Sequence, residues 1–237
     1  MKILAFDTAL DACSAAVWSD GRVLGRASVV AARGHAEILF SMLAEVLAEA
    51  GLGYGDIDRF AVTTGPGSFT GVRVGLAAAR GLALARLRPV VGVTTLEALA
   101  ATAMEAGEDI PAGTRLGVVI DARRNELYVQ IFETGPHGGL TALSPPEVIA
   151  HADAPARFVG PATIVGSGAG IVKAALGEGE GLCFSDEPLR PDAGIIARLA
   201  AERAIAADQP PPSPLYLRAP DAKLPGGVEP PVTASRS

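Results

Sequence analysis

Residues 3–18 read ILAFDTALDACSAAVW: an apolar run, a polar turn around Asp7, and a second apolar run. This pattern predicts a strand, a turn and a second strand. Residues 117–132 read GVVIDARRNELYVQIF and repeat it, with an apolar run, Asp121, a polar turn and an apolar-rich strand. Asp7 aligns with Asp121 without a gap. One interpretation is two generic β-hairpins; the other is a duplicated unit that builds two similar α/β lobes.

The rest of the chain alternates helix and strand signals. Asp20–Gly21 predicts a turn, Gly51 is a suitable helix cap, and Pro89 ends a second helix. The expected elements after the first hairpin are a strand at 22–30, helix at 35–50, strand at 59–63, helix up to about 87, strand at 90–93 and helix at 95–106. We expect an N-terminal lobe at 1–106, a smaller C-terminal lobe at 107–215, and a Pro-rich tail at 216–237.

The composition is that of a folded, acidic protein. Hydrophobic residues make up 49% of the chain, charged residues 19%, and the formal charge is −6. Lys and Arg supply most non-specific affinity for nucleic acid, so a chain of this charge is a poor stand-alone binder of it. Cys13 and Cys183 form no CxxC pair and indicate neither a disulfide framework nor a zinc knuckle. No stretch has the ~18 apolar residues of a membrane span, so we expect a cytoplasmic protein with no membrane contact.

The tail differs from the body in composition. Eight of the 18 prolines lie after Gln209, and such a segment is expected to be extended. Tyr216 and Leu217 are large apolar residues in this thin tail, so we expect PLYLR (214–218) to dock on the body. Residues from Gly226 onward are expected to lack fixed structure.

The loop TTGPGSFTGVR (63–73) is the most informative stretch. Glycines at 65, 67 and 71 permit backbone conformations closed to other residues, and Ser68 or Thr70 can cap the following helix. A strand, a glycine loop and a helix N-terminus can present N–H groups to an anion. However, Val72 stands where a Walker motif has Lys. A tight turn that lets two backbones approach is the alternative interpretation.

Taken together, ILAFDTALDACSAAVW, GPGSFTGVRVGLAAARGLAL, VGVTTLEALA, IDARRNELYV, VGSGA and PLYLR resemble the TsaB/YeaZ family in order and spacing. The match is dense over about residues 1–100 and patchier beyond. The resemblance implies an α/β fold of two ribonuclease-H-like lobes of the actin-like ATPase (sugar kinase, Hsp70, actin) type. It also implies a role in making N6-threonylcarbamoyladenosine (t6A) beside the anticodon of tRNAs that read ANN codons.

In that system, the resemblance implies a non-catalytic subunit that scaffolds a TsaD-like catalytic subunit and recruits a TsaE-like ATPase. It further implies a homodimer when the chain is alone, and contact with tRNA only through the complex. No cofactor is expected in the isolated chain, and ATP or ADP would bind, if anywhere, at an interface between subunits. An active ATP-dependent phosphotransferase of the same superfamily is the main alternative.

The first hairpin lacks a residue that this alternative needs. Actin-like ATPases have a glycine two residues after the hairpin Asp, which lets the backbone approach phosphate. Here the turn reads Asp7-Thr8-Ala9, and the second copy, Asp121-Ala122-Arg123-Arg124, lacks the glycine too. Asp7 could hold a metal or a water, or it could stabilise the turn. We therefore expect neither tight nucleotide binding nor catalysis by the isolated chain.

The histidines do not predict a metal site. Related catalytic subunits carry a His-x-x-x-His pair on one helical face. In this chain His35 is followed four residues later by Leu39, while His137 and His151 lie in expected loops. A protease is also not indicated, because neither an HExxH motif nor a Ser-His-Asp order is present.

A second glycine cluster, IVGSGAG (164–170), partly matches GxGxxG, with Asp186 at a suitable distance for a ribose. A NAD-binding oxidoreductase is thus a third interpretation. Too little chain follows for a full Rossmann sheet, and Gly177, Gly179 and Gly181 interrupt the expected helix.

Two helices are candidates for a partner surface. The helix at 35–50 is acidic with a broad apolar face, and the helix after the loop is basic, with small residues at 71, 75, 79 and 83. They either pack on their own sheet or dock a similar pair on another subunit. The candidate nucleotide residues are Asp7, Gly65, Gly67, Ser68 and Thr70. The candidate partner residues are His35, Ile38, Leu39, Met42, Val46, Gly71, Arg73, Gly75, Ala79 and Arg80.

Overall fold

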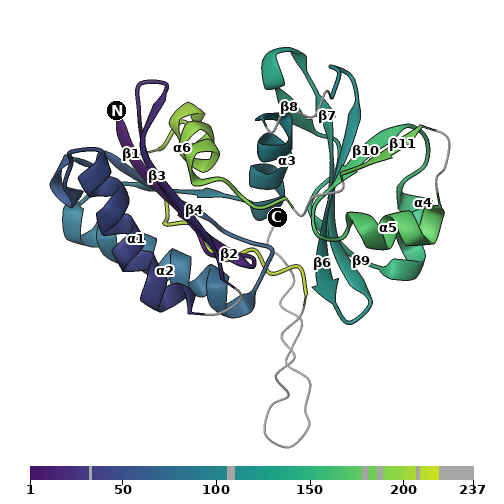
Figure 1. Ribbon diagram of the computed structural model, residues 1–237, viewed down its shortest axis with the longest axis horizontal. Helices are drawn as coiled ribbons and strands as arrows, with labels where there is room; N and C mark the ends of the chain where they lie inside the picture. The colour runs from purple at the N-terminus through teal and green to yellow at the C-terminus, as the bar shows by residue number, and fades with distance from the viewer. Residues whose placement is uncertain (32–33, 106–109, 178–180, 186–188, 207–208, 219–237) are drawn as a thin grey trace, which may run out of the picture.

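The computed structural model describes residues 1–31, 34–105, 110–177, 181–185, 189–206 and 209–218. Within them two sheets lie side by side, each with its own set of helices (Figure 1). No helix in these ranges is both long enough and apolar enough to cross a membrane.

The first sheet has the strand order β3-β2-β1-β4-β5. Its members are β1 (Lys2–Asp7), β2 (Ala12–Ser19), β3 (Arg22–Val30), β4 (Arg59–Thr63) and β5 (Val90–Val93). The strands β1, β2 and β3 are antiparallel, whereas β1, β4 and β5 are parallel. Leu4 and Phe6 point into a core on one face of β1, and Ile3 and Ala5 point into a core on the other. Burial on both faces explains why β1 is a continuous apolar run.

The second sheet repeats this topology in the order β11-β10-β6-β7-β8, with β9 paired to β7. Its members are β6 (Arg115–Arg123), β7 (Glu126–Thr134), β8 (Leu140–Ala142), β9 (Glu147–Ala150), β10 (Ala162–Val165) and β11 (Leu182–Phe184). The strands β6, β7 and β8 are antiparallel, and β6, β10 and β11 are parallel. The expected fold of two ribonuclease-H-like lobes is confirmed, and Asp7 and Asp121 lie at matching ends of β1 and β6.

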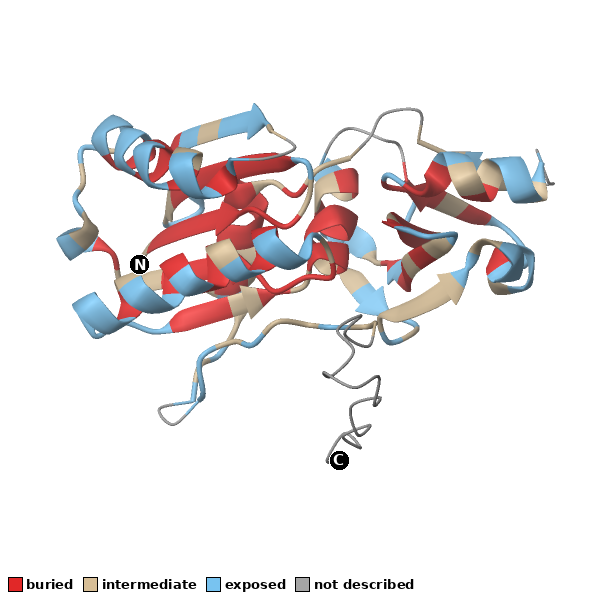
Figure 2. Cartoon of the chain, turned by 90° about the horizontal axis from the view of Figure 1, so that it is seen from below, coloured by how far each residue is buried: buried red, intermediate tan, exposed pale blue. Residues whose placement is uncertain are grey.

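Helices α1 (His35–Glu49) and α2 (Phe69–Arg86) cover one face of the first sheet (Figure 1). Gly51, with φ 65°, follows α1 in the left-handed conformation expected of a helix cap. The hydroxyl of Ser68 accepts a hydrogen bond from the N–H of Gly71 and caps α2, as the sequence predicts. Figure 2 shows buried residues on the strands at the centre of each lobe and exposed residues on the outward faces of the helices.

The second sheet carries shorter helices. They are α4 (Ala154–Arg157) and α5 (Ala169–Leu176). The single turn η2 (Pro136–Gly138) lies between β7 and β8, and η3 (His151–Asp153) directly precedes α4, whereas η1 (Tyr54–Asp56) belongs to the first lobe. Phe158, Val172 and Ile164 form the core between these helices and the sheet.

The two lobes exchange a helix. Helix α3 (Thr95–Glu105) follows the last strand of the first sheet, but Leu96 and Leu99 pack in a core with residues of β6, β7 and β10. Helix α6 (Ala193–Glu202) follows the second sheet, yet Ile196 packs with residues of β1, β4 and β5. The expected lobe boundary between residues 106 and 107 lies outside the described residues.

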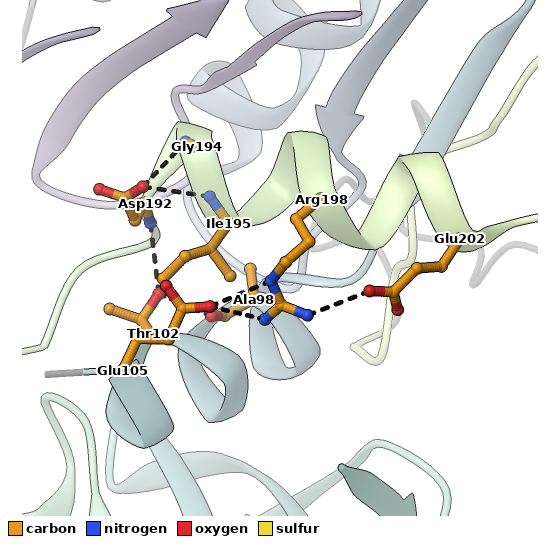
Figure 3. A network of polar contacts seen from close by, with 8 residues as sticks. All are labelled: Ala98, Thr102, Glu105, Asp192, Gly194, Ile195, Arg198 and Glu202. Carbon is orange, nitrogen blue, oxygen red and sulfur yellow. Dashed lines mark hydrogen bonds and ion pairs between the residues drawn. The ribbon is translucent and has the colours of Figure 1, made fainter. Parts of the chain in front are cut away.

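The exchanged helices also contact each other (Figure 3). Arg198 of α6 lies 2.8 Å from the carboxylate of Glu105 at the end of α3 and 3.2 Å from that of Glu202. Asp192 caps α6 by accepting hydrogen bonds from the N–H groups of Gly194 and Ile195. This polar network joins α3 and α6 at the seam between the lobes.

Candidate functional site

The glycine loop packs directly on the β1–β2 turn. The N–H of Ser68 donates to the oxygen of Ala9 over 2.7 Å, and the Thr8 hydroxyl donates to the oxygen of Gly71 over 2.7 Å. A Cβ at Gly67 would lie 2.4 Å from the Ala9 oxygen, and one at Gly71 would lie 2.0 Å from the Thr8 oxygen. These glycines therefore have a sufficient structural reason: they let two backbone segments of this chain approach each other.

Asp7 lies fully buried beneath this contact. Its Oδ1 accepts hydrogen bonds from the N–H of Ala9 and the hydroxyl of Thr63, while Oδ2 has no hydrogen-bond partner in the described part of the chain. Burial raises the pKa of Asp7 to about 6, and the hydrogen bonds from Thr63 and Ala9 oppose that rise. The carboxylate is thus held in place by the turn.

The turn does not fit a nucleotide phosphate. A phosphate would need free backbone N–H groups and room near the third residue of the turn. The N–H of Ala9 is used by Asp7, its oxygen is used by Ser68, and Ala9 itself is fully buried. Beside the turn, Arg190 holds the carboxylate of Asp11 at 2.8 Å and lowers its pKa.

The related turn of the second lobe is more open. Asp121 is partly exposed and accepts hydrogen bonds from the backbone and the guanidinium of Arg123 at 2.8 and 3.0 Å. The hydroxyl of Ser167 accepts a hydrogen bond from the N–H of Asp121. Arg123, Arg124 and Asn125 all have positive φ and form the tip of the β6–β7 hairpin.

Most of the candidate partner residues face the chain's own sheet. Of that set, the buried members are His35, Leu39, Met42, Val46, Gly71, Gly75 and Ala79, while Ile38 is half-buried. His35 lies 3.1 Å from the oxygen of Leu10 through its Nε2. A Cβ at Gly75 would lie 2.6 Å from the Thr8 hydroxyl and 3.2 Å from Val62. Only Arg73 and Arg80 of this set are exposed.

A different set of residues occupies the outward side of the two helices. Phe40 of α1, Leu84 of α2 and Leu87, which directly follows α2, are 53%, 78% and 87% exposed, and together with the exposed Gly81 we call them the docking face. A Cβ at Gly81 would meet nothing within 4 Å. The signal that could have found this face was an apolar residue outside the core stripe, such as Phe40.

Residues 209–218, called the strap below, run along the first lobe and end at the second. The N–H of Leu215 donates to the oxygen of Thr64 over 2.8 Å, and Arg80 donates to the oxygen of Pro212 over 2.6 Å. Arg218 donates to the oxygen of Ala122 and forms an ion pair with Glu126. The expectation that PLYLR docks on the body is confirmed. Residues 219–237 lie outside the described residues.

The second glycine cluster also serves packing. A Cβ at Gly166 would lie 2.3 Å from the oxygen of Val119, and one at Gly168 would lie 2.5 Å from the Val119 side chain. Asp186, proposed for a ribose contact, lies outside the described residues. His137 and His151 lie in η2 and η3, and no three His, Cys, Asp or Glu side chains gather for a metal among the residues described.

Comparison with known proteins places this arrangement in a family. Residues 27–142 match the family model described as TsaD, tRNA N6-adenosine threonylcarbamoyltransferase. The chain is 39% identical over 138 residues to the tRNA threonylcarbamoyladenosine biosynthesis protein TsaB of Escherichia coli K12, and this match covers 58% of each protein. The chain therefore spans little more than half of that curated relative.

Solved structures match over a greater length. YeaZ from Pseudomonas aeruginosa is 31% identical, with a TM-score of 0.71 over 85% of this chain and 92% of that one. A second P. aeruginosa structure, an uncharacterised protein similar to YeaZ, is 31% identical with a TM-score of 0.75, over 92% of this chain and 99% of the other. With this identity over nearly the whole length of both chains, the protein belongs to the TsaB/YeaZ family.

Proposed function

We propose that this chain is a non-catalytic subunit required for t6A synthesis, and that it acts by docking a TsaD-like catalytic subunit. The observation that carries the proposal is the contact between the glycine loop and the β1–β2 turn. The turn that grips phosphate in active members of the superfamily is occupied here by Ala9, whose N–H and oxygen both bond within the chain. The name of the E. coli relative, a tRNA threonylcarbamoyladenosine biosynthesis protein, supports the pathway.

The docking face is the part of the chain that a TsaD-like subunit would contact. Gly81 lies inside α2, where glycine costs about 1 kcal/mol relative to Ala. Nothing in the described chain needs that glycine, because its Cβ would point into open space. A partner helix that approaches closely at Gly81 would explain the residue, and the exposed Phe40 and Leu84 would then be buried.

The similarity of residues 27–142 to the TsaD family supports this mode of docking. Two subunits that share one fold can pack related helix pairs on each other, as in a homodimer. The same face therefore serves for self-association when the chain is alone. Recruitment of a TsaE-like ATPase, a shared ATP or ADP site at the interface, and a cytoplasmic location are supported by family membership alone.

The test combines binding with complementation. Gly81→Leu is expected to abolish co-purification with the TsaD-like protein of the same genome, and to reduce t6A in the tRNA of cells that depend on this chain. The matched control is Gly170→Leu, because Gly170 also lies in a helix with open space around its Cβ. Mass spectrometry of tRNA nucleosides measures t6A, and thermal melting shows that both variants fold.

Two results would contradict the proposal at different levels. If Gly81→Leu retains full binding, the docking face lies elsewhere on the chain. If the purified chain alone transfers the threonylcarbamoyl group to tRNA, it is an enzyme and the non-catalytic role is wrong.

A further inference from the structure

The face where α2 meets the strap is positively charged, although the whole protein is acidic. Helix α2 contains Arg73, Arg80 and Arg86 and no acidic residue, while the formal charge of the chain is −6. The strap contains no acidic residue, and its Arg218 is paired with Glu126 of the second lobe. Such local asymmetry is the electrostatic signature of a site for an anionic partner.

The two arginines at the centre of this face are not neutralised by carboxylates. Arg73 donates to the hydroxyl of Tyr216 over 2.7 Å, and Arg80 donates to the oxygen of Pro212. Both acceptors are uncharged, and none of the ion pairs among the described residues includes either arginine. Both side chains are exposed, so their full positive charge is available to a ligand.

Two aromatic rings lie beside these charges. Phe69 and Tyr216 are 56% and 48% exposed, with ring centroids 5.8 Å apart and planes inclined by 31°. The guanidinium carbon of Arg73 lies 3.6 Å from the centre of the Phe69 ring and 5.6 Å from that of Tyr216. Phe69, Arg73 and Tyr216 thus form an exposed group of flat surfaces, which we call the stacking platform.

The platform is assembled before any ligand arrives. The strap is fixed to the sheet by the hydrogen bond from Leu215 to Thr64. Its carbonyl oxygens approach the body so closely that a Cβ at Gly65 would lie 3.2 Å from the Leu215 oxygen. A preformed surface loses little conformational entropy when it binds.

We infer that the stacking platform and Arg80 form a contact site for single-stranded RNA, such as a loop of tRNA. An unstacked base would lie on the rings, and the neighbouring phosphates would bind Arg73 and Arg80. Exposed aromatics interleaved with arginine are how proteins hold unpaired nucleotides. The inference rests on the proposed function, in which tRNA is the substrate of the complex, and it gives this chain a direct part in holding it.

Arg80 of this site and Gly81 of the docking face lie on different sides of α2. Successive residues of a helix are rotated by about 100°, so Arg80 and Gly81 point to different sides of α2. Arg80 contacts the strap, whereas Gly81 contacts nothing within 4 Å of its Cβ position. Leu84 of the docking face lies four residues after Arg80 and therefore on the same side of α2, so a TsaD-like subunit that covers Leu84 would border the strap.

The experiment measures RNA affinity of the full chain and of its complex with the TsaD-like subunit. The probes are a fluorescent ten-nucleotide oligoadenylate and an unmodified tRNA transcript, titrated at several salt concentrations. Phe69→Leu removes one ring but keeps an apolar side chain, and is expected to weaken binding roughly 5- to 150-fold. Arg73→Gln with Arg80→Gln is expected to reduce the slope of log affinity against log salt by about 1.4.

Control variants separate charge from folding. Arg86→Gln with Arg88→Gln removes the same charge at and just beyond the C-terminal end of α2, and should leave the RNA affinity nearly unchanged. Arg73→Lys with Arg80→Lys keeps the charge but not the strap hydrogen bonds, and should keep the salt slope. If the glutamine variant releases the strap from the body, its loss of RNA affinity does not test the charges. Phe69→Leu then tests the platform, because the Phe69 ring makes no hydrogen bond to the strap.

The variants are compared for binding of RNA and for binding of the TsaD-like subunit. Loss of RNA binding with retention of the TsaD-like subunit supports it. Loss of that subunit with unchanged RNA affinity shows that the platform is a protein contact and overturns it, as does no change in either. The failure of the wild-type chain to support t6A synthesis would instead refute the proposed function, while the RNA titration would still judge the platform.

Discussion

The N–H of Ser68 donates a hydrogen bond to the backbone oxygen of Ala9 across 2.7 Å, and this contact closes the glycine loop onto the β1–β2 turn. The N–H of the same Ala9 donates to the buried carboxylate of Asp7. Both polar backbone atoms of Ala9 are therefore engaged within the chain, at the position where an actin-like ATPase needs a free approach to phosphate.

We predict that the isolated chain does not bind ATP tightly and does not hydrolyse it. Isothermal titration calorimetry with ATP and Mg²⁺ should show no binding in the micromolar range. A micromolar or tighter dissociation constant would show that the loop opens, and would favour the phosphotransferase alternative. Because the titration uses the isolated chain, it does not test a nucleotide site that forms only at the interface with a TsaD-like subunit.

Two glycines of α2 should respond in opposite ways to the same substitution. Gly75→Leu would drive a side chain into Thr8 and Val62, and we expect a loss of about 1–3 kcal/mol in the free energy of unfolding. Gly81→Leu has open space and should keep or slightly raise stability, because leucine is the better helix former. Urea unfolding of both variants measures the difference. Equal stability of the two variants would show that the core tolerates a side chain at Gly75.

Asp7 should make stability depend on pH in the direction opposite to most acidic residues. Burial raises the pKa of Asp7 from its ordinary value of 3.8 to about 6, so the folded state binds the proton more tightly than the unfolded chain does. The stabilisation from protonated Asp7 is complete below about pH 4 and is lost as the pH rises through 6. The full effect is about 3 kcal/mol.

Asp7→Asn removes this titration. The difference in unfolding free energy between the variant and the wild type should therefore change by most of that amount, about 2 kcal/mol, between pH 4 and pH 7, in favour of the variant at the higher pH. A constant difference across this range would show that Asp7 does not titrate there.

The strap should be structural and the end of the chain dispensable. Truncation after Gly226 is expected to leave the melting temperature nearly unchanged. Truncation after Gln209 removes the contacts of Leu215, Tyr216 and Arg218, and is expected to lower it by several degrees. Thermal melting of the two truncated chains tests this. A large drop for the first chain would show that the end of the tail contributes to folding.

Sequence patterns could predict the strands and the repeat because both depend on local composition. The apolar run that ends at Asp7 is buried on both faces, and the same pattern recurs at Asp121. Local sequence patterns could not predict whether the small residues of α2 face the chain's own sheet or a partner. Spacing shows that Gly75 permits a close approach, but not that the approaching group is Thr8, which lies far away in the sequence.

The exchange of α3 and α6 between the two lobes could not be predicted from the sequence either. Helix α3 has Leu96, Leu99 and several buried alanines around its circumference, so its pattern does not tell which sheet it covers. The exposed Phe69 and Tyr216 come from segments far apart in the chain, and only the fold brings their rings together.

The crossed placement of α3 and α6 makes the two halves of this chain dependent on each other for folding. A fragment ending at Glu105 would keep α3 but have no second sheet to bury Leu96 and Leu99, and its own sheet would lack α6 over Ile3 and Ala5. Separate expression of the two halves would therefore yield two fragments with exposed apolar surfaces, which would be prone to aggregate, rather than two folded domains.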